Sequence, residues 1–121
     1  MTGVYTRYFE RMTCLGLGQP HENVMKRIEK VEFDKFEWDK SKEQLNIQKH
    51  GIDFDEASIA LSQPHLEVRS DRNGEVRTLA ICPSSGRIIA VVYTMRGEKC
   101  RIISARAARD YEQAEYRHNY P

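Results

Sequence analysis

Tight-turn sequences divide the C-terminal half of the chain into four short apolar segments, and this division restricts the fold more than any other feature. The turns are Asp71-Arg72-Asn73-Gly74, Pro83-Ser84-Ser85-Gly86 and Gly97-Glu98. Glycine and asparagine at these positions favour the two-residue loops of β-hairpins. The sequence therefore predicts an antiparallel meander of strands at about 66–70, 75–82, 87–95 and 99–105.

The last of these turns also predicts a register. A two-residue loop at Gly97-Glu98 makes three cross-strand pairs, Arg96 with Lys99, Thr94 with Arg101, and Tyr93 with Ile102. If side chains alternate without interruption, Ser104 lies on the same sheet face as Ile102.

Two helices are predicted before the meander. Asp39 is a favourable N-cap, and Gly51 is a natural residue for the helix C-terminus, so the first helix runs between them. Asp53-x-x-Glu56 is a capping-box signature for a second helix, which ends before Pro64.

The first of these helices has few apolar residues, chiefly Leu45 and Ile47. One of its faces must therefore do something other than pack. Asn46 and Lys49 share one side of this helix, and His50 follows four residues after Asn46.

The remaining segments complete an α+β domain. Residues 33–38 alternate partly and predict an edge strand, and a last helix is expected at about 106–118. We expect an antiparallel sheet with two N-terminal helices and a C-terminal helix, all on one side of the sheet. Residues 1–31 show no apolar period and are interpreted as a poorly ordered extension to a domain at 32–121.

Composition excludes several classes of protein. With 121 residues, 40% of them hydrophobic and 31% charged, the chain is typical of one folded domain. The longest apolar run, Ile88 to Tyr93, is far too short to cross a membrane, and no secretory signal is visible, so we expect a cytoplasmic protein. Three widely spaced cysteines predict neither a disulfide framework nor a zinc site.

Charge is distributed unevenly although the formal net charge is only +1. Residues 77–109 hold seven Lys or Arg, six of them arginine, and one acidic residue, Glu98. Arginine binds phosphate through two parallel hydrogen bonds, so this segment indicates a confined polyanion site. The alternative is that these arginines pair with the acidic half of the chain or with a partner.

Several short motifs occur in a familiar order. They are Phe36-Glu37-Trp38-Asp39, then Lys42, Asn46, Lys49-His50-Gly51 and Phe54-x-Glu56-Ala57, and later Val91-Val92-Tyr93-Thr94-x-Arg96 and Arg101-Ile102-Ile103-Ser104-Ala105-Arg106, continued by Glu112 and Tyr116. Together they resemble the BrnT toxins over about residues 33–120.

This resemblance implies a RelE-like fold and a toxin that cleaves RNA and inhibits translation. It also implies neutralisation by a small ribbon-helix-helix antitoxin, BrnA, in a hetero-oligomeric complex. The resemblance further implies that this complex represses its own operon, with the antitoxin supplying the contacts to operator DNA.

Cleavage of RNA without a metal uses the 2′-OH of the RNA as nucleophile and needs a base, an acid and cations. Lys49 and His50 are the candidates for acid–base chemistry, because imidazole titrates near neutrality. Arg77, Arg101 and Arg106 are the candidates for stabilising phosphate, because they project from adjacent strands or from a strand end. No cluster of carboxylates suited to two metal ions is evident, so no metal or other cofactor is expected.

Each of these residues also has a structural interpretation. His50 fits a helix end favoured by the helix dipole, and Lys49 fits a solvated surface. Arg87 and Arg96 are candidates for binding substrate, but cations at turns are commonly solvated. Tyr93 either stacks on a base or is a core residue beneath the last helix.

Trp38 is interpreted as a core residue that holds the first helix to the sheet. His65 is interpreted as a surface residue.

Two further functions compete with the ribonuclease. A toxin-like protein that binds an antitoxin or RNA without turnover needs no acid–base pair beside its arginines. A DNA-binding regulator is disfavoured, because the second helix carries Asp55 and Glu56 and no Lys or Arg between residues 53 and 63.

Overall fold

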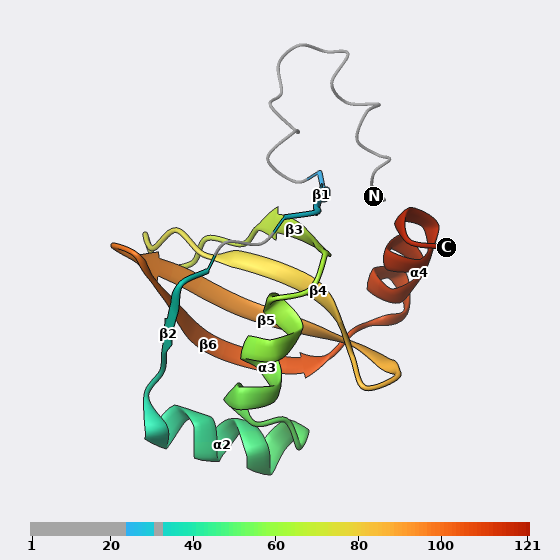
Figure 1. The fold of residues 1–121 in the computed structure, drawn as a ribbon. Helices are drawn as coiled ribbons and strands as arrows, with labels where there is room; N and C mark the ends of the chain where they lie inside the picture. Colours follow the sequence, from blue (N-terminus) through green and yellow to red (C-terminus); the bar gives the residue numbers. More distant parts are fainter. Residues whose placement is uncertain (1–23, 31–32) are drawn as a thin grey trace.

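A six-stranded sheet organises the part of the chain that the computed structural model describes, residues 24–30 and 33–121 (Figure 1). In spatial order its strands are β1 (Lys26–Ile28), β3 (His65–Arg69), β4 (Thr78–Ser84), β5 (Arg87–Arg96), β6 (Lys99–Ala107) and β2 (Lys35–Glu37). Neighbouring strands are antiparallel, except that β2 runs parallel to β6. The fold is α+β, and the predicted meander and edge strand are confirmed.

The turns between the strands have the expected backbone. Ser85 and Gly86 both have positive φ, 49° and 83°, as a primed hairpin turn requires, and Ser84 pairs with Arg87 across this loop. The predicted register of the last hairpin is also confirmed, with Arg96 opposite Lys99.

A β-bulge interrupts that register further along. Tyr93 lies opposite Ile102, but Val92 lies opposite Ser104, so Ile103 is an extra residue in β6. Because the bulge reverses the alternation, Ala105 and not Ser104 joins Ile102 on the buried face. The expectation for Ser104 is therefore wrong.

The helices α2 (Lys40–His50) and α3 (Phe54–Leu61) cover one face of the sheet. The predicted caps of α2 are confirmed: Asp39 Oδ1 accepts from the Ser41 N–H at 2.8 Å, and Gly51 ends α2 with φ 70°. For α3, Asp53 accepts from the Glu56 N–H as predicted, but the Glu56 side chain binds Ser84 and Arg87 and does not complete the capping box. The main core lies between α3 and the sheet. It comprises Ile52, Phe54, Ala57, Ala60, Leu61, Ala80, Cys82, Ile89, Val91, Tyr93, Cys100, Ile102 and Ala105.

Trp38 packs against this core as predicted. Its ring meets Phe54 edge-on at 6.0 Å, and its Nε1–H donates to Glu43 at 3.1 Å.

The helix α4 (Asp110–Asn119) differs from its prediction in two ways. It begins at Asp110, because β6 continues to Ala107 in pairing with β5. It packs through Tyr116 and Tyr120 on Leu66, Ile81 and Ala90, which lie on the opposite face from α2 and α3. The helices therefore do not share one side of the sheet (Figure 1).

The N-terminal region contributes more than the sequence pattern indicates. Residues 26–28 form β1 and pair with β3, although they fall within the predicted extension at 1–31. Residues 1–23 and 31–32 of that extension lie outside the described residues. Across the described part of the chain, no helix has the length and apolar character to span a bilayer.

Candidate functional site

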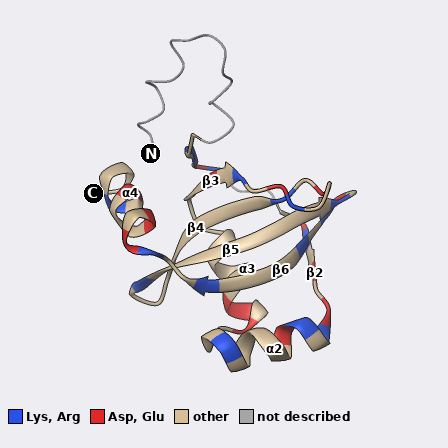
Figure 2. Ribbon diagram, turned by 180° about the vertical axis from the view of Figure 1, so that it is seen from behind, with Lys and Arg blue, Asp and Glu red and all other residues tan. Residues whose placement is uncertain are grey.

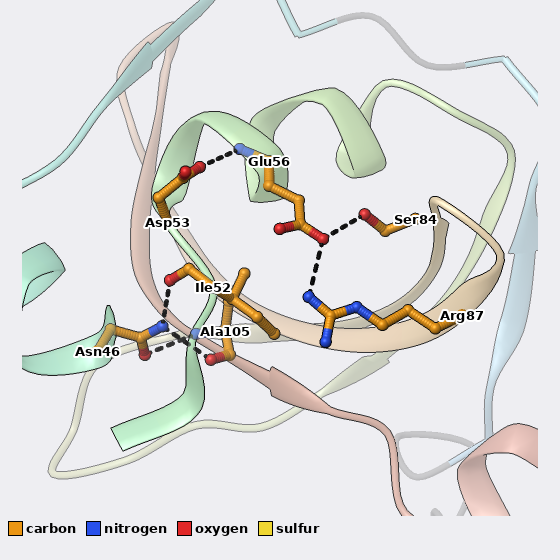
Figure 3. A network of polar contacts seen from close by, with 7 residues as sticks. All are labelled: Asn46, Ile52, Asp53, Glu56, Ser84, Arg87 and Ala105. Atoms are coloured by element: carbon orange, nitrogen blue, oxygen red, sulfur yellow. Dashed lines mark hydrogen bonds and ion pairs between the residues drawn. The ribbon is translucent and has the colours of Figure 1, made fainter. Parts of the chain in front are cut away.

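The buried side of α2 is polar, which explains why this helix has few apolar residues. Asn46 Nδ2 donates to the carbonyls of Ala105 and Ile52, both at 2.9 Å, and Asn46 Oδ1 accepts from the Ala105 N–H at 3.1 Å (Figure 3). The Asn46 amide thus provides hydrogen-bond partners for the N–H and the carbonyl of Ala105, which lies on the outer edge of β6 beyond the end of β2. Leu45 is 58% exposed, so the apolar residues of α2 face outward.

This anchor positions Lys49 and His50 at the end of α2. Both side chains are exposed, and neither makes a hydrogen bond or ion pair within residues 24–30 and 33–121. They follow Asn46 by one helical turn, and Asn46 binds the backbone of Ala105, while the neighbouring Arg106 side chain lies on the opposite sheet face and binds Glu112 of α4. Figure 2 shows Lys and Arg at both ends of α2 and at the end of β6.

Three predicted arginines gather on the sheet face that α2 and α3 leave free, and we call Arg77, Arg96 and Arg101 the arginine cluster. Arg101 lies opposite Thr94 in β6 and β5, and Thr94 Oγ1 donates to the carbonyl of Val76, the residue before Arg77. Arg77 and Arg101 are therefore two strand spacings apart, about 10 Å.

Carboxylates already face each member of the arginine cluster. Glu75 binds Arg77 at 2.8 Å and lies 4.0 Å from Arg96, and Glu37 lies 3.3 Å from Arg101. The side chains of Arg77 and Arg101 are still 23% and 25% exposed. The alternative of pairing with the acidic half of the chain therefore holds for Arg101 and Glu37, whereas Glu75 lies in the basic half, and these pairs leave the cluster open to solvent.

Arg106 is held more firmly than the cluster. Its two terminal nitrogens donate to the two carboxylate oxygens of Glu112 at 2.8 and 2.9 Å, and Glu112 also accepts from the Arg109 N–H at 2.7 Å. Burial raises the pKa of Glu112, but the hydrogen bonds from Arg106 and the Arg109 backbone outweigh it, so the pKa is lowered overall.

The position of Arg106 along the sheet separates it from the cluster. Arg106 pairs with Ala90, four residues of β5 from Thr94, which corresponds to about 13 Å.

Arg87 lies far from the arginine cluster. It starts β5, whereas Arg96 ends that strand, so the two are roughly 30 Å apart. Glu56 accepts from Arg87 at 3.1 Å and from the Ser84 hydroxyl at 2.7 Å (Figure 3). These residues line a cavity of about 880 Å³ between α3, the β4–β5 turn and α4. The structure therefore does not bring Arg87 to the arginine cluster.

Tyr93 and His65 are core residues. Tyr93 is 5% exposed, meets Phe33 edge-on and donates from its hydroxyl to Glu67 at 2.6 Å. It lies on the α2 and α3 face and not beneath α4, and its buried ring presents no surface for base stacking. His65 is fully buried, with Nε2 2.8 Å from Glu67, so its assignment to the surface is wrong.

One acidic group approaches the geometry of a metal site. Oxygens of Glu43, Asp53 and Asp55 lie within 4.8 Å of one another. Glu43 already accepts from the Phe54 N–H at 2.9 Å, and Asp53 accepts from the Glu56 N–H at 2.7 Å. Both carboxylates thus accept hydrogen bonds from backbone N–H groups at the start of α3, and we assign no metal to this group.

Sequence reasoning missed two residues that shape this region, Glu37 and Asn46. Glu37 reaches Arg101 from 64 residues away, through the parallel pairing of β2 with β6. Asn46 was placed on a helix face with Lys49, but no local pattern indicates that it binds β6. The one available signal was the shortage of apolar residues in α2.

The family of the chain follows from a comparison with known proteins. A family model described as the ribonuclease toxin, BrnT, of the type II toxin–antitoxin system matches residues 38–112. The match covers α2, α3, the strands β3 to β6 and the arginine cluster. No curated protein matches the sequence. Since the match extends over more than half of the chain, the protein belongs to the BrnT family of ribonuclease toxins.

Proposed function

We propose that the chain is a metal-independent endoribonuclease that cleaves RNA through the 2′-OH of the substrate. The observation that supports this best is the collection of Arg77, Arg96 and Arg101 on one partly open sheet face. Arginines pre-positioned in this way bind phosphate oxygens and stabilise the charge of a phosphorane. We also propose that the fold is RelE-like, with the RNA bound on this face of the sheet.

We propose Lys49 and His50 at the end of α2 for proton transfer, and Arg106 on β6 as a further phosphate ligand. Asn46 holds the end of α2 against Ala105 and so fixes the two titratable side chains at that edge of the sheet, whereas the Arg106 side chain lies on the α4 face, where it binds Glu112. Both are exposed and have no competing partner among the described residues, which leaves them available to transfer protons. We propose no role in catalysis for Arg87 or Tyr93.

A type II toxin has an antitoxin partner, and for this chain we propose a BrnA-like ribbon-helix-helix protein in a hetero-oligomer. An acidic or covering segment of it would neutralise the arginine cluster by occupying the place of RNA phosphates. Operator DNA would be bound through the antitoxin alone. Free toxin would act in the cytoplasm and inhibit translation by cutting RNA.

The affinity of the chain for its antitoxin tests whether the antitoxin covers the arginine cluster. If the arginine cluster is covered, the double variant Arg77→Ala/Arg101→Ala binds the antitoxin at least tenfold more weakly in calorimetry. Unchanged affinity would show that the antitoxin binds elsewhere.

The enzymatic proposal is tested with purified full-length chain and a long synthetic RNA in excess EDTA. We expect new ends that carry 2′,3′-cyclic phosphate, and loss of cleavage in His50→Ala/Arg101→Ala. The matched control is Arg117→Ala, which removes an exposed arginine of α4.

Two outcomes contradict parts of the proposal. Intact RNA, also after translating ribosomes are added, favours a toxin-like partner that binds without turnover. Cleavage that persists in the double variant means that the enzyme class is right and the residues are wrong.

A further inference from the structure

The strand β2 brings a carboxylate into the arginine cluster. Parallel pairing places Glu37 beside Arg101 on the same sheet face, and Glu37 Oε2 lies 3.3 Å from Arg101 Nη1. Its other oxygen, Oε1, lies 4.0 Å from Lys99 Nζ. The Glu37 side chain is 28% exposed, so a molecule bound at the cluster can reach it.

We infer that Glu37 is the general base of the cleavage reaction, an assignment that rests on the proposed function above. A phosphate group that binds the guanidinium of Arg101 necessarily lies next to the Glu37 carboxylate. The same phosphate carries the 3′-oxygen of the ribose whose 2′-OH must be deprotonated. Base and phosphate ligand are thus supplied by two adjacent residues of paired strands, which hold their geometry better than loops do.

Other titratable groups are less well placed for this role. Lys49 and His50 lie at the end of α2, which Asn46 holds at Ala105, and no contact within residues 24–30 and 33–121 joins them to the arginine cluster. Glu112 is fully buried and binds Arg106 through both oxygens. Glu75 is the nearest competitor, but it lies in the turn between β3 and β4 and its Oε1 is held by Arg77 at 2.8 Å.

The step balances without a metal or a cofactor. A Glu37 oxygen takes the proton of the 2′-OH as O2′ forms a bond to the adjacent phosphorus. The bond between phosphorus and O5′ breaks, O5′ leaves with the electron pair and takes a proton from solvent. The products are a 2′,3′-cyclic phosphate and a free 5′-hydroxyl, and Arg101 stabilises the phosphorane between them.

Glu37→Gln in the full-length chain tests the inference, because glutamine keeps the shape and an oxygen that accepts from Arg101. We expect the single-turnover cleavage rate to fall about 10²–10⁴-fold. RNA binding, measured on a substrate with 2′-deoxyribose at the cut site, stays the same or tightens, since one negative charge is lost. Glu37→Asp, which keeps the carboxylate, should retain more activity than Glu37→Gln.

Two matched variants separate this effect from a general change in charge. Glu98→Gln removes an exposed carboxylate from the β5–β6 turn and should cleave as the unmodified chain does. Glu75→Gln removes the competing carboxylate. A loss in Glu75→Gln that exceeds the loss in Glu37→Gln would overturn the inference.

The pH profile separates a base from a residue that only positions Arg101. The charged side chains that face Glu37 are all cations, Lys35 on its own strand and Lys99 and Arg101 on β6. An acid limb in the single-turnover rate therefore reports the carboxylate, and Glu37→Gln should lose it. A purely positioning role would weaken RNA binding and leave the limb in place.

Failure of this inference is distinguishable from failure of the proposed function. If the unmodified chain cuts RNA and Glu37→Gln cuts it equally well, Glu37 is not the base and the ribonuclease assignment stands. If the unmodified chain does not cut RNA under any condition, both proposals fall together.

Discussion

The sheet face beneath α2 and α3 and the face that carries the arginine cluster are built from the same strands with opposite residue types. On β6, Cys100 and Ile102 are buried in the core, while Arg101 between them points to the other face. The core face excludes water, whereas the charged groups of the arginine face remain partly exposed to solvent. Figure 2 shows the strands uncharged over most of their length, with cations towards the strand ends.

This difference separates the residues that stabilise the fold from those proposed to act on RNA. The core face obtains its free energy from buried apolar area, which is worth about 25 cal/mol per Å². The ion pairs of the arginine cluster are partly exposed, and pairs of this kind contribute about 0–1 kcal/mol. Substitutions on the two faces should therefore fail in different assays.

The sharpest test of this comparison uses two neighbours on β6. Arg101→Ala should lower RNA cleavage about 100-fold or more and leave the urea unfolding midpoint nearly unchanged. Ile102→Ala should lower the free energy of unfolding by about 3 kcal/mol and leave cleavage intact at temperatures where the variant is folded. If Arg101→Ala unfolds the protein instead, the two faces are not functionally separate.

A substitution at Asn46 tests whether a polar contact can also stabilise the fold. Asn46→Ala leaves the N–H and the carbonyl of Ala105 without their partner, and we expect a loss of about 2 kcal/mol in the free energy of unfolding. Gln48→Ala, on the exposed side of the same helix, is the control and should change little. Equal stability of the two variants would mean that water replaces the amide at β6.

The Glu112–Arg106 pair joins α4 to β6 on the face opposite α2 and α3, and the pH dependence of stability tests its contribution. The lowered pKa of Glu112 in the folded state means that this carboxylate stabilises the fold at pH values above its unfolded pKa, about 4.3. That contribution is lost as the pH falls through the lower, folded pKa. Stability should therefore decrease on acidification.

Glu112→Gln isolates this contribution. We expect it to cost about 1–2 kcal/mol near pH 7 and to reduce the dependence of stability on acid pH. Urea unfolding between pH 3 and pH 7 measures both effects. An acid dependence identical to that of the unmodified chain would assign it to other carboxylates, such as Glu67, whose pKa is also lowered.

The smallest expected effect concerns an apolar residue outside both regions. Leu45 is 58% exposed on α2, so Leu45→Ser should change the free energy of unfolding by no more than about 0.5 kcal/mol. Thermal unfolding of the isolated chain measures it. A loss above about 1 kcal/mol would show that Leu45 is covered in solution.

Much of the fold was predictable because its signals are local. The turns at Asn73-Gly74 and Ser85-Gly86 depend on backbone conformations that few residue types adopt, and the Asp39 cap needs one side chain and the next N–H groups. Predictions failed where distant contacts decide. Ser104 changes face because of a bulge, and α4 starts late because β6 stays paired to Ala107.

The candidate site was only half predictable for the same reason. Enrichment of arginine in residues 77–109 is visible in the chain, and three of the predicted cations share one sheet face. Arg87 and Arg96 look equivalent in sequence, since both lie at turns, yet they occupy opposite ends of β5. Which of them joins Arg101 depends on the strand length and register.

By itself, the sequence determined the hairpins, the caps of the first two helices and the concentration of arginine, since each depends on residues a few positions apart. Tertiary structure alone decided that β2 delivers Glu37 to Arg101, that Asn46 completes the edge of β6, and that α4 packs on the opposite face from α2 and α3. These outcomes depend on pairing and packing between residues up to 64 positions apart. Local conformational preference carries no information about such contacts, because their free energy appears only when the distant segments meet.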